Sequence, residues 1–138
     1  MSQQMPAPPT GNPPRTILVV DDEVLIRMPL AEYLRSCGYR VVEAASVAEA
    51  RTLLDADAAV DLVFTDANAP GGENGFILAN WVRHRRPGVK VLLTSGIPHA
   101  AAKASELCGD LLTKPYEHES VLRRIQTLLH HATMTAGG

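Results

Sequence analysis

Polar residues follow four of the apolar runs in this chain, and their types suit phosphoryl chemistry. In chain order they are Asp21 with Asp22, then Asp66, Ser95 and Lys114. Carboxylates that lie close together repel one another, and desolvating each of them costs several kcal/mol unless it is paired. The residues therefore need a partner of opposite charge, and the sequence offers one in the ammonium of Lys114.

A hard divalent cation is the second group that could hold the carboxylates together. Mg²⁺ suits one or two carboxylates completed by waters and phosphate oxygens. With Mg²⁺ and Lys114 supplying positive charge and Ser95 supplying a hydroxyl donor, Asp66 would be a nucleophile that accepts a phosphoryl group.

Each residue taken alone also has an ordinary structural explanation. An aspartate after a strand commonly caps the next helix, so Asp22 or Glu23 could simply open one. Ser95 with Gly96 is a turn signal, and a lysine followed by proline is typical of a loop. The chemical interpretation rests on finding all of them at the ends of strands in one fold.

The elements that must position these residues alternate between strands and helices. Apolar runs too short for helices predict buried strands at residues 16–20, 40–43, 61–65, 89–94 and 109–113. A helical pattern follows each strand. The first has Ile26, Leu30, Leu34 and Cys37 on one face and stops at Gly38, and the second opens with a capping box of Ser46 and Glu49. The remaining helices are predicted at residues 76–86, 98–108 and 116–131.

Five strand–helix units of this kind predict an α/β fold. Apolar strands separated by helices form a parallel sheet with helices on both faces. Right-handed crossovers leave few topologies, of which the (βα)5 flavodoxin-like order 2-1-3-4-5 is the best known at this size. The carboxyl ends of the strands then lie at one edge, with Asp21, Asp22 and Asp66 at the switch point between the first and third strands.

Length and composition narrow the class of protein. A chain of 138 residues suits one domain, and two cysteines are too few for a disulfide framework or a zinc site. A formal net charge of −2 argues against nucleic-acid binding, which usually needs a basic face. No apolar run approaches the roughly 18 residues of a membrane span, and no secretory signal opens the chain. We therefore expect a cytoplasmic protein with neither membrane nor nucleic acid as partner.

The ends of the chain differ from its middle. Residues 1–14 contain five prolines and no charged side chain, which predicts a disordered tail. Residues 133–138 are expected to fray. The folded domain is expected to cover 15–132.

The motifs also resemble a known family. The segments ILVVDDE, DLVFTDANAPGG, LLTSG and LTKP look like the receiver domain of bacterial two-component response regulators, such as the chemotaxis regulators; they lie at residues 17–23, 61–72, 92–96 and 112–115. The resemblance implies that Asp66 is the phosphoacceptor. It also implies that Asp22, Asp66 and the backbone carbonyl of Asn68 bind Mg²⁺ directly, with Asp21 acting through water.

The same resemblance assigns the remaining site residues. Ser95 would be the switch hydroxyl, and Lys114 would contact the phosphoryl oxygens. Leu111 stands at the readout position, where the family usually has a large aromatic residue, so activation cannot rely on an aromatic ring at this position. The loop at residues 67–75 is one residue longer than the commonest form, and Pro29 lies inside the first helical pattern.

The resulting functional hypothesis is a signalling switch and not an enzyme beyond its own phosphorylation and dephosphorylation. A sensor histidine kinase or phosphotransfer protein would phosphorylate Asp66, and the phosphorylated form would bind a downstream protein target, with no output domain in this chain. One alternative is a receiver that acts as a constitutive interaction module. Another is a phosphatase of the haloacid dehalogenase type, which needs a general acid two residues after its nucleophile; Asn68 holds that place after Asp66, and Glu23 holds it after Asp21.

Overall fold

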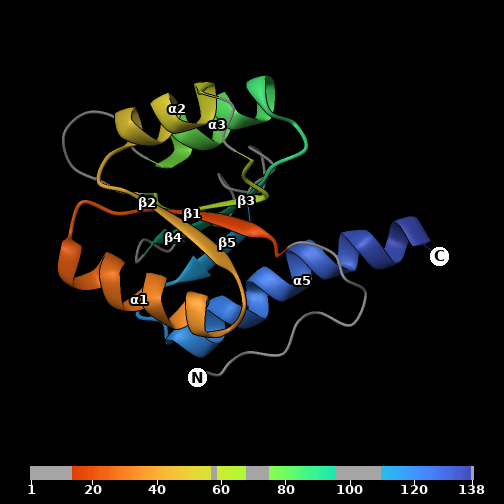
Figure 1. Ribbon diagram of the computed structural model, residues 1–138. Helices are drawn as coiled ribbons and strands as arrows, with labels where there is room; N and C mark the ends of the chain where they lie inside the picture. The colour runs from red at the N-terminus through yellow and green to blue at the C-terminus, as the bar shows by residue number, and fades with distance from the viewer. Residues whose placement is uncertain (1–13, 57–58, 68–74, 96–109, 138) are drawn as a thin grey trace.

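The computed structural model describes residues 14–56, 59–67, 75–95 and 110–137, with side chains up to His130 (Figure 1). The strands in these ranges are β1 (Thr16–Val20), β2 (Arg40–Ala44), β3 (Leu62–Asp66), β4 (Lys90–Ser95) and β5 (Asp110–Thr113). The helices are α1 (Val24–Ser36), α2 (Val47–Asp55), α3 (Gly75–Arg85) and α5 (His118–Gly137). Each strand predicted from the sequence is present, with boundaries that differ by one residue at most.

The sheet has the predicted topology. All strand pairs are parallel, and the order across the sheet is β2-β1-β3-β4-β5. Helices α1 and α5 cover one face, and α2 and α3 cover the other (Figure 1). The chain places β2 on one side of β1 and β3 on the other, so the carboxyl ends of β1 and β3 frame the switch point of the sheet. The helix predicted at residues 98–108 lies outside the described residues.

Two hydrophobic cores lie on opposite faces of the sheet. Ile17 and Val19 of β1 belong to the core beneath α1 and α5, whereas Leu18 and Val20 belong to the core beneath α2 and α3. This alternation follows from the strand geometry, in which successive side chains point to opposite faces. None of the four side chains is more than 3% exposed. A strand buried on both faces is what a covered parallel sheet requires at its centre.

Local signals fix the ends of the first two helices. The amide of Glu49 donates to Ser46 Oγ at 3.0 Å, and the Glu49 carboxylate accepts the Ala45 amide at 2.6 Å, so the predicted capping box opens α2. Gly38 follows α1 with a φ of 102°, which glycine adopts without steric cost.

Helix α1 continues through Pro29. Proline removes the amide that would have bonded the carbonyl of Leu25 one turn earlier. Leu25 is 86% exposed, so water reaches this turn and can hydrate the freed carbonyl. The proline is therefore tolerated at the solvent-facing end of the helix.

Helix α5 begins at His118 and extends to Gly137, past residue 131, where the sequence predicted its end. Val121, Ile125 and Leu129 recur every fourth residue and are buried in the core shared with α1. The fraying expected at residues 133–138 stays a prediction, and the tail at 1–13 lies outside the described residues. Within the described ranges, no helix combines the length and apolarity needed to cross a membrane.

Candidate functional site

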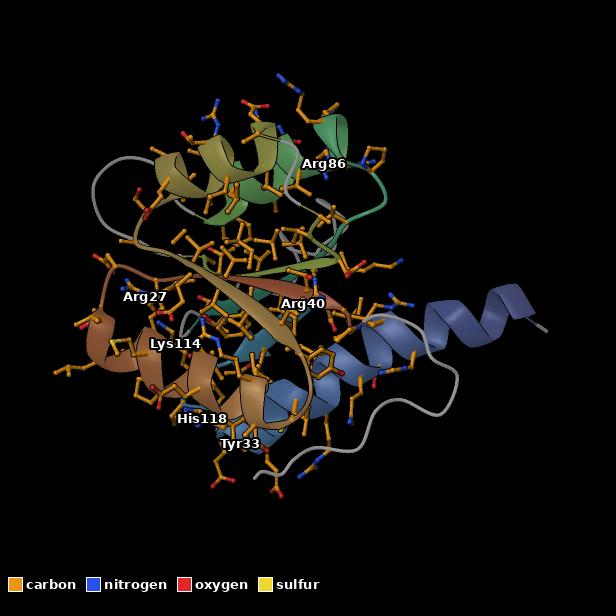
Figure 2. The ribbon with its side chains drawn as sticks, viewed as in Figure 1. Arg27, Tyr33, Arg40, Arg86, Lys114 and His118 are labelled. Atoms are coloured by element: carbon orange, nitrogen blue, oxygen red, sulfur yellow. The ribbon has the colours of Figure 1, made fainter. Side chains whose placement is uncertain are left out.

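Asp66 and Lys114 form the centre of the candidate site. Asp66 is the last residue of β3, and Lys114 directly follows β5. Lys114 Nζ donates to Asp66 Oδ2 at 2.7 Å, and the two side chains are 38% and 20% exposed. Figure 2 shows Lys114 at the end of the sheet opposite Arg40, the first residue of β2. The fold thus brings the predicted nucleophile and the predicted phosphate-binding cation into contact at a solvent-accessible edge.

Ser95 ends β4 beside this pair and is 1% exposed. Two backbone hydrogen bonds join the strand ends here. The amide of Ala67 donates to the carbonyl of Thr94 at 2.8 Å, and the amide of Lys114 donates to the carbonyl of Ser95 at 2.9 Å. The three predicted residues therefore stand on strand ends that are bonded to one another, so their main chains are fixed by the sheet.

Asp21 and Asp22 occupy the turn between β1 and α1. Asp21 Oδ1 accepts the amide of Glu23 at 2.9 Å, in an Asx turn that leads into the helix. Burial raises the pKa of the Asp21 carboxyl, the Glu23 amide opposes this, and the negative charges of Asp66, Asp22 and Glu23 raise the pKa further. Asp22 is exposed. The predicted acidic group thus exists as a set of carboxylates that repel one another.

The donor chemistry of this edge fits a hard divalent cation. Asp21, Asp22 and Asp66 offer oxygen ligands only, and the charge of Asp66 contributes to the raised pKa of Asp21. Among the described residues, no group of three or more His, Cys, Asp or Glu side chains is placed to hold a metal ion by itself. This is compatible with Mg²⁺, which keeps several waters and needs only one or two carboxylates. The other predicted ligand, the backbone carbonyl of Asn68, lies outside the described residues.

Gly75 begins α3 directly against the main chain of the predicted nucleophile. A Cβ at this position would lie 2.9 Å from the Cα of Ala67 and still closer to the carbonyl oxygen of Asp66. Contacts this short force the backbone to shift, so α3 can begin here only because the residue is glycine. The sequence alone does not reveal this role of Gly75, because the approach of a helix to a strand end is a tertiary contact.

Tyr116 is a neighbour of the site that the sequence analysis missed. Its ring packs edge-on against Phe64 of β3, with centroids 5.9 Å apart. Burial raises the pKa of the Tyr116 phenol to about 12, and the charges of Asp21 and Asp66 add to the effect. An aromatic residue so soon after the predicted lysine was the signal that could have found it.

Leu111 occupies the position predicted for readout. It pairs with Leu93 of β4 and packs, partly buried, on the core beneath α2 and α3. A leucine therefore fills this place as an ordinary apolar core residue, and its part in signalling stays a prediction.

Exposed apolar side chains lie on α1 beside the site. The α1 apolar surface, formed by Val24, Leu25, Ile26 and Met28, has exposed fractions between 40% and 86%. A surface groove of about 480 Å³ runs between α1 and the segment after β5, and Leu25, Ile26 and Lys114 are among its lining residues. Apolar surface of this kind commonly marks contact with another macromolecule.

Comparison with known proteins identifies the family and its curated members. The family model described as the response regulator receiver domain matches residues 17–126. The transcriptional regulatory protein GltR of Pseudomonas aeruginosa is 34% identical over 126 residues, which cover 88% of this chain and 51% of GltR. The aerobic respiration control protein ArcA of Escherichia coli is 32% identical over 124 residues, which cover 88% of this chain and 50% of ArcA. The chain spans about half the length of these relatives.

Solved structures share the fold. A putative response regulator from Chloroflexus aurantiacus matches with a TM-score of 0.77 at 30% identity, covering 85% of this chain and 98% of that one. The response regulator protein TrrA from Thermotoga maritima, solved in complex with Mg²⁺ and BeF, matches with a TM-score of 0.74 at 28% identity, covering 83% of this chain and 99% of that one. Since the family model covers most of the chain and the curated relatives exceed 30% identity, the chain belongs to the response regulator receiver domains, the phosphorylation-dependent signalling modules of two-component systems.

Proposed function

We propose that Asp66 is the phosphoacceptor of this receiver domain. The observation that supports the proposal most directly is the 2.7 Å contact between Asp66 Oδ2 and Lys114 Nζ at the switch point of the sheet. A carboxylate is a weak nucleophile toward a phosphoryl group because both are negatively charged. A fixed ammonium beside the attacking oxygen offsets that repulsion, which is the main contribution a protein makes to phosphoryl transfer.

The proposed step is a single displacement at phosphorus. An Oδ atom of Asp66 forms a bond to phosphorus, the bond from phosphorus to the donor nitrogen or oxygen breaks, and the donor leaves with that electron pair. Lys114 then pairs with a phosphoryl oxygen, and the Ser95 hydroxyl donates to another. The product is an acyl phosphate, which water can hydrolyse at the same site.

Mg²⁺ is the proposed cofactor, and bound at this edge it would neutralise charge on the phosphoryl oxygens. We propose that Asp22, Asp66 and the carbonyl of Asn68 hold it directly and that Asp21 contacts it through water. Burial is the main cause of the raised pKa of Asp21, but the Asp66 and Asp22 carboxylates add to it, and a cation would relieve this added repulsion.

The proposed phosphodonor is a sensor histidine kinase or a phosphotransfer protein. The α1 apolar surface lies beside the site, and Leu25 and Ile26 line the same groove as Lys114. A donor protein must place a phosphorylated side chain against Asp66, so a surface that adjoins the site is where its own apolar residues would pack. Replacing Leu25 by Glu should slow phosphotransfer from such a protein while leaving labelling by a small phosphodonor unchanged.

The proposed output is altered binding of a downstream protein in the cytoplasm. Phosphorylation would move Lys114 from its present contact with Asp66 and draw Ser95 toward the phosphoryl group, which changes the loops after β4 and β5. The curated relatives are named as transcriptional or respiratory control proteins, but this chain spans about half of each and carries a net charge of −2. We therefore propose a protein partner for this domain, and not nucleic acid.

The decisive experiment is labelling with acetyl phosphate and Mg²⁺, followed by intact mass. The wild-type chain should gain the mass of one phosphoryl group and lose it on treatment with hydroxylamine, which cleaves acyl phosphates. Asp66→Asn should gain none, because its amide cannot attack, whereas Asp61→Asn, which alters an aspartate outside the site, should label normally. Undiminished labelling of Asp66→Asn, or labelling that needs no divalent metal, would contradict the proposal.

A capture experiment separates the switch from a constitutive interaction module. A partner retained by the beryllofluoride form and not by the untreated form supports the switch. Equal retention by both forms supports constitutive binding.

A further inference from the structure

The guanidinium of Arg27 joins three elements beside the site. Its Nη1 donates to the main-chain carbonyl of Asp21 at 2.8 Å, and its Nε donates to Glu43 Oε1 at 3.0 Å. Arg27 lies on α1, Glu43 on β2, and Asp21 in the turn after β1. The Arg27 and Glu43 side chains are only 16% and 23% exposed. Figure 2 shows Arg27 toward the same end of the sheet as Lys114.

These contacts fix the peptide unit that precedes Asp22. The amide of Asp21 donates to the carbonyl of Ala44 at 3.0 Å, so β2 fixes the main-chain nitrogen of Asp21. Arg27 holds its carbonyl. Because a peptide bond is planar, the carbonyl of Asp21 and the amide of Asp22 share one rigid unit. Arg27 therefore restrains the orientation of the peptide unit from which the Asp22 main chain continues.

The acidic turn, formed by Asp21 and Asp22, needs such a restraint because the negative charges of its carboxylates repel one another. Burial is the largest cause of the raised pKa of Asp21, and the negative charges of Asp66, Asp22 and Glu23 raise this pKa further, so these carboxylates repel one another. Arginine is suited to the task, since its planar fork donates to two acceptors at once and keeps its charge at any ordinary pH. A lysine at the same place could donate to both acceptors only by leaving this geometry.

We propose that Arg27, oriented by Glu43, is a positioning residue that holds the Asp21–Asp22 turn in the conformation that binds a divalent cation. Arg27 touches neither the nucleophile Asp66 nor the phosphoryl group, so it acts through the main chain of Asp21. The inference rests on the proposed function, because it presumes that the turn binds Mg²⁺.

Arg35 provides a matched control on the same helix. It donates to the other oxygen of the same carboxylate, Glu43 Oε2 at 3.3 Å, and to the carbonyl of Val41 at 2.9 Å. It lies eight residues after Arg27, about two helical turns further from the acidic turn. Removing Arg35 thus removes a charge and a contact to Glu43 while leaving the contact to Asp21 in place.

The test compares Arg27→Gln, Arg27→Lys and Arg35→Gln with the wild-type chain. Mg²⁺ binding is measured by titration of the unphosphorylated protein, and the rate of labelling by acetyl phosphate is measured across a Mg²⁺ series. Arg27→Gln should raise the Mg²⁺ concentration for half-saturation about tenfold, as expected for loss of a group that orients metal ligands. Saturating Mg²⁺ should restore most of its labelling rate, Arg27→Lys should show a smaller defect, and Arg35→Gln should match the wild type.

The outcomes separate this inference from the proposed function. If the wild type binds Mg²⁺ and is labelled while Arg27→Gln has an unchanged half-saturation, the inference is overturned and the proposed function stands. An equal defect in Arg35→Gln also overturns it, because the effect then comes from Glu43 and not from Asp21. If the wild type neither binds Mg²⁺ nor is labelled, the proposed function itself fails. Should Arg27→Gln not fold, Arg27→Lys decides by the same Mg²⁺ half-saturation.

Discussion

The ammonium of Lys114 contacts the Asp66 carboxylate at 2.7 Å although 48 positions separate the two residues along the chain. The contact exists because β3 and β5 flank β4 in the sheet, so that their carboxyl ends lie one strand apart. In the unphosphorylated protein, Lys114 therefore neutralises the same carboxylate that a metal ion would bind. Lys114 and a cation compete for one charge.

This competition predicts the effect of Lys114→Met. Removing the ammonium takes away a positive charge that competes with a cation for the Asp66 carboxylate, so the affinity for Mg²⁺ should rise roughly 3- to 10-fold at low salt. Magnesium titration by isothermal calorimetry measures the change. Lys90→Met is the control, because Lys90 is exposed at the opposite end of β4 and should leave the affinity unchanged. A weaker affinity in Lys114→Met would show that Lys114 supports the metal site instead.

Gly75→Ala should destabilise the protein through the main chain of Asp66. The added methyl group would overlap the Asp66 carbonyl and approach the Cα of Ala67 to 2.9 Å, which forces α3 away from β3. We expect a loss of about 1–3 kcal/mol in the free energy of unfolding, as is typical of overpacking. Urea denaturation measures it.

Gly88→Ala is the matched control for this substitution. A Cβ at Gly88 meets nothing within 4 Å, so the free energy of unfolding should change by less than about 0.5 kcal/mol. Equal losses in the two variants would show that the cost comes from the helix or turn propensity and not from contact with Asp66.

The Tyr116 phenol should lose its proton at a higher pH than an ordinary tyrosine, and this ionisation should destabilise the folded state. Its pKa is raised from 10.0 to about 12, chiefly by burial. Between these two values the folded state binds more protons than the unfolded state, so the free energy of unfolding falls as the pH rises from 10 to 12. Absorbance of tyrosinate should show a transition near pH 12 that is missing in Tyr116→Phe. In Asp21→Asn the transition should move to lower pH, because Asp21 contributes to the shift.

Asp21→Asn should stabilise the protein in the absence of divalent metal. The pKa of Asp21 is raised in the folded state, so its ionisation at neutral pH favours unfolding. The gain over the wild type should shrink as the pH falls through the range where Asp21 takes up its proton. Thermal unfolding in buffer with chelator measures the gain, and Glu32→Gln, which alters an exposed carboxylate on α1, should show none. Saturating Mg²⁺ should reverse the order and make the wild type more stable than Asp21→Asn.

The sequence predicted the strands, their order and the meeting of Asp21, Asp66, Ser95 and Lys114, because these follow from apolar periodicity and from parallel topology. Asp66 and Ser95 end β3 and β4, and Asp21 and Lys114 directly follow β1 and β5. What the sequence could not predict depends on how the helices dock on the sheet. The bond from Arg27 to the Asp21 carbonyl and the approach of Gly75 to Asp66 are set by how helices dock on the sheet, and no periodic pattern encodes them.

The burial of Tyr116 escaped prediction for a similar reason. The sequence shows that residue 116 is a tyrosine, but only the packing of its ring against Phe64 shows that the ring lies beside the acidic residues. The ligand role of Asn68 and the helix at 98–108 stay predictions, since both lie outside the described residues.

The two hydrophobic cores have a consequence for how this domain can evolve. In the part of the chain that the structure describes, no buried side chain belongs to both cores, because the sheet separates them. Substitutions such as Leu34→Ala on α1 and Leu54→Ala on α2, one in each core, should then have additive costs, as is usual for residues without shared partners. The absence of epistasis across the sheet would let the surface of α1 and α5 diverge toward one partner while the surface of α2 and α3 remains under separate selection. A lineage could thereby change the surface of α1 and α5 without first re-adapting the opposite face.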